Sequence, residues 1–114
     1  MQAASTLAPA VMPQHMEALE HANRVRLARA CLKRAVAADE VGAAEIVRDC
    51  PWEVESMTIG ELLRSQRRWG RTRVRKFLTA LALNENRELG RLTHRQRSML
   101  VFELESKRLG NDTA

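Results

Sequence analysis

The chain has 114 residues, of which 45% are hydrophobic and 29% charged, and its formal net charge is +5. This length allows one modest hydrophobic core, and the composition excludes a wholly disordered chain. Tyr is absent and aromatic residues make up only 4%, so we predict an all-α fold without a sheet. No apolar run approaches the roughly 18 residues of a membrane span and the start lacks the basic segment of a secretion signal, which predicts a soluble, cytoplasmic protein.

The N-terminal third is predicted to contain a flexible tail at residues 1–12 and then one long helix. After Pro13, which suits the first turn of a helix, no Gly or Pro interrupts a run of helix formers as far as Ala38. An irregular apolar stripe follows this helix: Met16, Leu19, Leu27, Leu32 and Val36. Five basic residues point in several directions around the middle of this helix: Arg24, Arg26, Arg29, Lys33 and Arg34. They form either a solvated face or part of a contact with a ligand.

Residues 39–61 contain seven acidic residues and one Arg, and Cys50-Pro51-Trp52 marks a break within this segment. This pattern predicts a short helix followed by a turn or loop. At the end of the stretch, Thr58-Ile-Gly-Glu61 fits the capping box, in which hydroxyl and carboxylate satisfy free N–H groups at a helix start. A helix is therefore expected from Ile59 to Arg68, with Gly70 as the left-handed residue where the chain turns.

Two further helices are predicted in the C-terminal part. Between Arg71 and Leu83, apolar residues recur at the spacing of one buried helix stripe: Val74, Phe77, Leu78 and Leu81. Thr93-His-Arg-Gln96 is a second capping box, which opens a final helix that reaches Leu109 and is ended by Gly110. Residues 13–110 are thus predicted to form a single helical domain, with residues 111–114 as a C-terminal tail.

The basic charge is concentrated in the C-terminal half. Residues 64–108 hold 13 basic and 4 acidic side chains, whereas residues 1–63 hold 6 basic and 9 acidic ones. Such a surplus of positive charge favours a polyanionic partner, with nucleic acid as the first candidate and an anionic membrane surface as the second. Taken alone, the run of charged residues is also explained by a solvated face. The acidic segment 39–61 is expected to face away from any DNA.

Two groups of basic residues surround predicted helix starts, one at Gly70 and one at Thr93. A helix start offers unpaired N–H groups and a partial positive charge, and a Gly before it lets the backbone approach a phosphate closely. We therefore expect the two groups to converge on one surface that holds the phosphate backbone of double-stranded DNA. The predicted DNA-binding residues are Arg67, Arg68, Gly70, Arg71, Thr72, Arg73, Arg75, Lys76, Arg87, Arg91, Thr93, Arg95 and Arg97.

No catalytic, cofactor or metal site is predicted, and no small-molecule substrate is expected. The three histidines share no metal-binding spacing with one another or with cysteine, and no Ser-His-acid set is evident. Cys31 and Cys50 lack CxxC spacing and are expected to be reduced thiols. Trp69 is expected in the core, with stacking on a base or insertion into a groove as the alternative.

The order of these motifs resembles the actinobacterial integration host factor family over about residues 16–109. The resemblance rests on Met57-Thr-Ile-Gly-Glu-Leu-Leu63, Trp69-Gly-Arg-Thr-Arg73 and Gly90-Arg-Leu-Thr-His-Arg-Gln-Arg97, after a long helix and a short acidic one. It implies a long N-terminal helix before a helix-two-turns-helix core of three to four helices. It also implies a nucleoid-associated protein that binds double-stranded DNA with little sequence preference, changes its shape and assists phage integrase complexes.

By position, the resemblance implies that Gly70 is the turn glycine, that Arg71 and Arg73 are its basic contacts, and that Arg87, Arg95 and Arg97 also contact DNA. The sequence departs from the family pattern at Glu88 and Gly90, where basic residues are expected. Three alternatives stay open: an RNA- or ribosome-associated protein with the same core, a related glycosylase, and a protein-interaction module whose acidic segment docks a basic partner. The glycosylase is disfavoured because the N-terminal proline nucleophile and a cysteine zinc finger are both missing.

Overall fold

The computed structural model describes residues 14–113, and their side chains as far as Lys107. These residues form five α-helices and two short 3-10 helices and contain no strand, which confirms the predicted all-α fold. The α-helices are α2 (Gln14–Ala37), α3 (Ala43–Asp49), α4 (Ile59–Arg64), α5 (Arg71–Ala80) and α6 (His94–Thr113); the 3-10 helices are η1 (Trp52–Val54) and η2 (Leu89–Arg91). The predicted tail at residues 1–12 lies outside the described residues.

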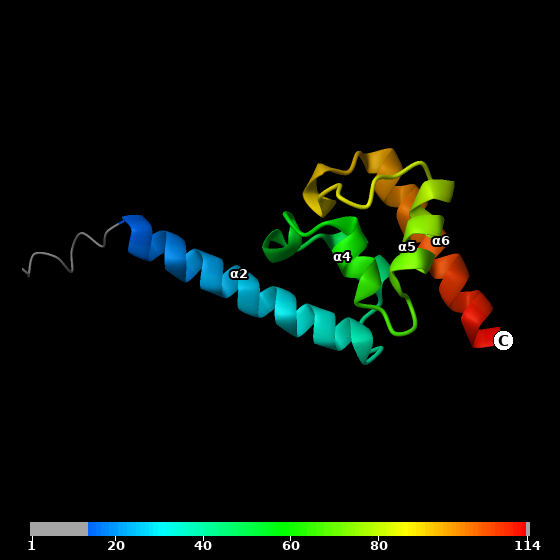
Figure 1. The fold of residues 1–114 in the computed structure, drawn as a ribbon, viewed down its shortest axis with the longest axis horizontal. Coiled ribbons are helices and arrows are strands. Elements are labelled where there is room, and N and C mark those ends of the chain that lie inside the picture. Colours follow the sequence, from blue (N-terminus) through cyan, green and yellow to red (C-terminus); the bar gives the residue numbers. More distant parts are fainter. Residues whose placement is uncertain (1–13, 114) are drawn as a thin grey trace, which may run out of the picture.

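Helix α2 is the predicted long N-terminal helix, and its first turns project away from the other helices (Figure 1). At 1.5 Å per residue its 24 residues span roughly 36 Å. The helix packs against η1, and the rings of His21 and Trp52 stack there with centroids 5.3 Å apart. Lys33 Nζ lies 2.6 Å from Glu61 Oε2 and so joins α2 to α4.

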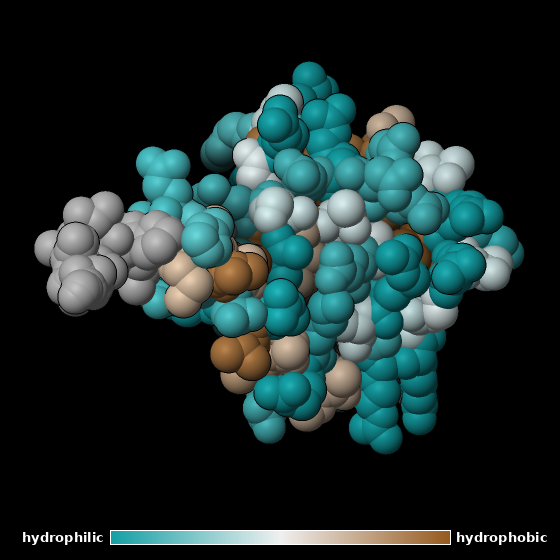
Figure 2. Space-filling view, turned by 60° about the vertical axis from the view of Figure 1, so that its left-hand side comes forward, coloured by the Kyte–Doolittle hydropathy of each residue, from teal (hydrophilic) through white to brown (hydrophobic). Residues whose placement is uncertain are grey.

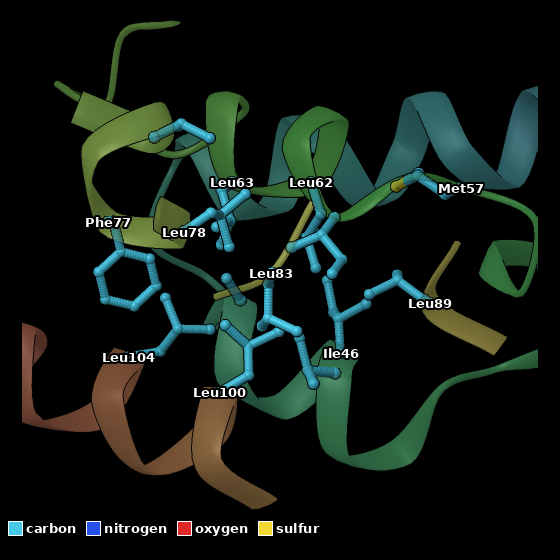
Figure 3. Packing of buried hydrophobic residues seen from close by; sticks show 14 of the residues in the cluster. Ile46, Met57, Leu62, Leu63, Phe77, Leu78, Leu83, Leu89, Leu100 and Leu104 are labelled. Carbon is cyan, nitrogen blue, oxygen red and sulfur yellow. The ribbon is translucent and has the colours of Figure 1, made fainter. Parts of the chain in front are cut away.

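One apolar core lies between α3, α4, α5 and α6 (Figure 3). Each helix contributes buried side chains to it, among them Ile46, Leu62, Leu63, Leu78 and Leu100. The apolar stripe predicted for α5 is confirmed at three positions, which are buried, while its fourth residue lies just beyond the helix end and is half-buried: Val74, Phe77, Leu78 and then Leu81. This core fixes how the starts of α5 and α6 are oriented.

Both predicted capping residues are confirmed. At the start of α4, the Glu61 N–H donates to Thr58 Oγ1 over 3.1 Å, while the Glu61 carboxylate pairs with Lys33. At the start of α6 the box is complete, because the Gln96 N–H donates to Thr93 Oγ1 (3.1 Å) and the Thr93 N–H donates to Gln96 Oε1 (3.0 Å). These short-range signals were therefore sufficient to locate two helix starts.

The predicted ends of two helices are wrong. Helix α4 stops at Arg64 and not Arg68, because the side chains of Ser65 and Gln66 donate to the carbonyls of Leu62 and Leu63 at 2.5 and 3.2 Å and so compete with helix continuation. Helix α6 continues through Gly110 to Thr113, beyond the predicted end at Leu109. A single Gly inside a helix costs only about 1 kcal/mol, which the preceding turns offset.

Replacing Leu100 by Ala should lower the free energy of unfolding by about 2–5 kcal/mol, since this fully buried side chain of α6 would leave a cavity in the core. Urea denaturation followed by circular dichroism measures the loss. Phe102 on the same helix is 66% exposed, so Phe102→Ala serves as the matched control and should change stability by less than about 1 kcal/mol. Equal losses for both variants would contradict the described packing of α6.

Candidate nucleic-acid interface

The start of α5 has no side-chain cap. Its cap residue is Gly70, whereas Thr58 and Thr93 supply hydroxyl caps to α4 and α6. The first helical hydrogen bond of α5 runs from the Val74 N–H to the Gly70 carbonyl over 3.1 Å, so the N–H groups of residues 71–73 precede it. An uncapped start combines free donors with the positive end of the helix dipole, which favours an anion.

Glycine at position 70 is required neither by the backbone nor by packing. Its φ of −82° and ψ of 180° are extended values that any residue adopts, so the predicted left-handed turn at Gly70 is wrong. The residue with positive φ in this loop is Arg68, at 70°. Apart from its chain neighbours and the backbone of α5, a Cβ at Gly70 would meet no atom of the described residues within 4 Å, so the space beside the α5 start is open to a ligand.

Trp69 attaches the loop before α5 to the core. Its side chain is buried, and its ring meets Phe77 of α5 edge-on, with centroids 5.2 Å apart. The guanidinium carbon of Arg73 lies 4.3 Å from the Trp69 ring centroid, a cation–π contact on the same side chain. The prediction of a core position for Trp69 is thus confirmed, and this anchor determines where Gly70 and Arg71 lie.

The basic residues around Gly70 are mostly free of internal partners. Four of them are exposed and, among the residues whose side chains are described, have no ion-pair partner: Arg67, Arg68, Arg71 and Lys76. Arg75 differs, because its Nε lies 3.3 Å from Glu85 Oε2. Thr72 is exposed and lines a shallow hollow on the outer face of α5 with Arg75, Lys76 and Thr79.

Sequence reasoning missed Arg64 and Glu85 at the edge of this group. Arg64 Nη1 lies 3.7 Å from Glu85 Oε1, so one carboxylate faces both Arg64 and Arg75 and partly neutralises them. Glu85 is 21 residues from Arg64 and ten from Arg75, and no local spacing signals such a contact. These two arginines are therefore weaker candidates for an external anion than their unpaired neighbours.

The second basic group is divided between exposed and engaged residues. Arg87, Arg91 and Arg95 are all exposed, but Arg91 has a partner within the chain, because its Nε lies 3.1 Å from Glu88 Oε1. The departure from the family pattern at Gly90 has a packing reason: its N–H donates to the Glu55 carbonyl, and a Cβ there would lie 3.0 Å from Glu55 Cβ. The chain needs Gly at that position for close backbone approach, independently of any ligand.

Arg97 has a structural role that the sequence did not reveal. Its Nη1 donates to the Val47 carbonyl over 2.7 Å and its Nη2 to the Leu89 carbonyl over 2.9 Å, so it joins α3, η2 and α6. The Val47 carbonyl lies 50 residues from Arg97 in sequence and the Leu89 carbonyl eight, and the side chain is half-buried. Its predicted contact with DNA remains untested, but its terminal nitrogens already have partners within the protein.

The two helix starts do not form one compact clamp. In Figure 1, α5 begins at the lower end of the helical group and runs upward, while α6 begins at the top and runs downward. The Gly70 and Thr93 groups therefore lie at opposite ends of the α5–α6 layer, in contrast to the predicted convergence. The exposed face of α5, with Arg75 and Lys76, lies between them. The α5 start, which is uncapped, has the stronger features of an anion site.

The described residues contain neither a metal-binding cluster nor a membrane span. Between residues 14 and 113, no three His, Cys, Asp or Glu side chains gather closely enough to hold a metal ion. Across the same residues, none of the helices has both the length and the apolar character needed to cross a bilayer. Cys31 is exposed, Cys50 is half-buried, and each is a free thiol.

The fold is shared with sIHF, the Streptomyces integration host factor, whose structure was determined bound to an 8-base-pair palindromic DNA. The match has a TM-score of 0.68 and covers 75% of this chain and 98% of that chain, at 23% sequence identity. No protein-family model and no curated protein gives a significant match. At this identity the likeness shows the fold, so the architecture implied by the sequence resemblance is confirmed.

Two arginines in the first turn of α6 should respond to substitution to very different extents. Arg97→Ala removes two hydrogen bonds from a charged, half-buried donor and should lower the free energy of unfolding by roughly 1.5–3 kcal/mol. Arg95→Ala removes an exposed side chain and should change it by less than about 0.5 kcal/mol. Thermal and urea denaturation compare the two variants. A larger loss for Arg95→Ala would refute the structural role of Arg97.

Proposed function

We propose that the protein is a non-enzymatic, architectural DNA-binding protein of the bacterial nucleoid, which holds double-stranded DNA mainly by its phosphates. The observation that carries this proposal is the uncapped start of α5, surrounded by exposed arginines that have no ion-pair partner among the side chains that the structure describes. The shared fold with sIHF, a protein solved in complex with DNA, supports the same ligand class.

At the proposed site, a phosphate oxygen accepts hydrogen bonds from the first N–H groups of α5. The guanidinium groups of Arg67, Arg68 and Arg71 add full positive charges, and guanidinium matches the geometry of phosphate oxygens. Gly70 leaves room for the sugar-phosphate backbone, because no side chain projects from the cap position. Contacts of this kind fix the position of a duplex without reading its sequence, so affinity should be similar for unrelated duplexes.

The proposal includes a change in DNA shape. The exposed Arg95 lies in the first turn of α6, whose start lies at the opposite end of the α5–α6 layer from the start of α5, and the exposed Arg87 precedes η2; both offer further phosphate contacts. A duplex that reaches both ends must follow the protein surface between them, and the added contacts offset the energy of bending. Such bending would assist a recombination complex, for example one containing a phage integrase, which is the role implied by the sequence resemblance.

Binding should depend strongly on salt. If about six phosphates are neutralised, the logarithm of affinity should fall with the logarithm of salt concentration at a slope of roughly −5. Fluorescence anisotropy with several unrelated duplexes and a structured RNA measures this slope. A slope near zero would refute phosphate binding, and preference for the RNA over every duplex would support the RNA-binding alternative.

The joint substitution Arg67→Ala and Arg71→Ala should weaken binding to all duplexes alike and reduce the slope to about −3.6, because two phosphate contacts are lost. A matched control is Arg34→Ala with Arg48→Ala, which removes the same charge from exposed positions on α2 and α3. If the control weakens binding equally, net charge and not the α5 start controls affinity. If only one duplex loses affinity, base readout is indicated.

Gly70→Ser tests the role of the empty cap directly. A Ser hydroxyl at this position caps α5, so stability should stay equal or rise by a few tenths of a kcal/mol. DNA affinity should fall several-fold, because the hydroxyl occupies an N–H group and the side chain enters the space proposed for the phosphate backbone. Calorimetric melting and anisotropy measure the two effects. Unchanged affinity in a fully folded variant would exclude phosphate binding at the α5 start.

A further inference from the structure

The outer face of α2 carries large apolar side chains that nothing in the described protein covers. Met16 is 43% exposed, Leu19 56% and Leu27 70%. They follow one another at three- and eight-residue intervals, so they lie on one side of the helix, away from the side that holds His21 and Arg29. Figure 2 shows apolar side chains among hydrophilic ones on this side of the molecule.

The face has an internal symmetry centred on Asn23. Leu19 stands four residues before Asn23 and Leu27 four residues after it, and all three belong to the same side of α2. When two such helices lie antiparallel with their Asn23 residues opposite each other, Leu19 of each packs against Leu27 of the other. In the same register Met16 lies opposite Ala30, a large residue against a small one. A single Asn within an apolar helix interface is a known means of fixing register.

The charges on α2 favour the same antiparallel arrangement. Residues 14–22 contain Glu17 and Glu20 and no Lys or Arg, whereas residues 24–34 contain five basic residues and no acid. Two of those bases already have partners within the chain, which leaves Arg24, Arg26 and Arg34. Antiparallel helices set the acidic half of one copy against the basic half of the other. Parallel helices would set like charges together.

We propose that two copies of this chain associate through the outer faces of their α2 helices, antiparallel and centred on Asn23. Glu20 of each copy then lies near Arg24 of the other, since the two residues flank the same edge of the apolar face. The helical groups lie on the outer sides of the pair, so neither obstructs the contact. The dimer itself does not depend on DNA. Its consequence does rest on the proposed function: a dimer carries two α5 starts and so bridges two duplexes.

Sedimentation equilibrium of the full chain without DNA tests the dimer. Because the contact involves only one helix from each copy and is smaller than a standard interface, we expect a dissociation constant on the order of 10–100 µM, with the mass rising from 12.9 kDa toward twice that value. Leu27→Glu should weaken dimerisation roughly tenfold or more. Phe102→Glu, at a comparably exposed apolar position on α6, is the matched control and should leave it unchanged. Both positions are exposed, so both variants should fold.

Charge reversal and cross-linking test the arrangement. Glu20→Arg and Arg24→Glu should each weaken the dimer, and the two together should restore it. With Cys31→Ser, Asn23→Cys should give a disulfide-linked dimer under mild oxidation. The unmodified chain should not cross-link through Cys31, which lies opposite residue 15 in the proposed register.

Three results would overturn the proposal. The first is a chain that stays monomeric in sedimentation at several hundred micromolar. The second is an equal effect of Leu27→Glu and Phe102→Glu on dimerisation. The third is efficient cross-linking of the unmodified chain through Cys31. Coverage of the face by residues 1–13 would give the first result. Coverage by DNA would give association only when a duplex is added. If the chain stays monomeric but still binds DNA at nanomolar concentration, the dimer is refuted and the proposed function stands. If the chain forms the dimer but does not bind DNA, the proposed function is refuted and the dimer stands.

Discussion

The burial of Trp69 is the constraint on which the geometry of the candidate interface depends. Its ring packs against Phe77 and lies 4.3 Å from the guanidinium carbon of Arg73, so the loop before α5 is fixed to the same core that holds α5. Without this anchor, the six residues between α4 and α5 would be a loose connection. With it, the uncapped N–H groups and the neighbouring arginines keep a fixed relative position, and preorganised donors bind an anion at a lower entropic cost.

The basic residues of this half have two different tasks. One set stabilises the fold: Arg97 binds two backbone carbonyls, Arg73 lies over Trp69, and Arg91 pairs with Glu88. The other set is exposed and unpaired among the described side chains, and it gathers where the helix start has no cap. The total charge therefore overstates the number of basic residues that are available for binding. Arginines with a partner inside the protein are already used by the fold, and arginines without one are available to an external anion.

Sequence reasoning was reliable where the signal is local. The hydroxyl cap at Thr58, the capping box at Thr93, the stripe from Val74 to Leu78 and the core position of Trp69 depend on neighbours within a few residues, and all are confirmed. The other half of the box predicted at Thr58 is absent, because the Glu61 carboxylate pairs with Lys33. Sequence reasoning failed where tertiary packing decides: the Arg97 contact with Val47, the Arg64 contact with Glu85 and the opposed directions of α5 and α6 depend on how separate elements pack, which no local spacing signals. The expectation at Gly70 failed differently, because the residue matters for open space and not for a left-handed backbone.

Phosphate binding at the α5 start is tested by mapping the amide chemical shifts of the protein as it is titrated with a short duplex. We expect the largest changes on the amides of Gly70, Arg71, Thr72 and Arg73, with smaller changes near Arg87 and Arg95 and almost none on α3. If those amides at the α5 start stay unperturbed while the complex forms, and the changes instead concentrate on α2 or on the acidic segment, phosphate binding at the uncapped helix is contradicted.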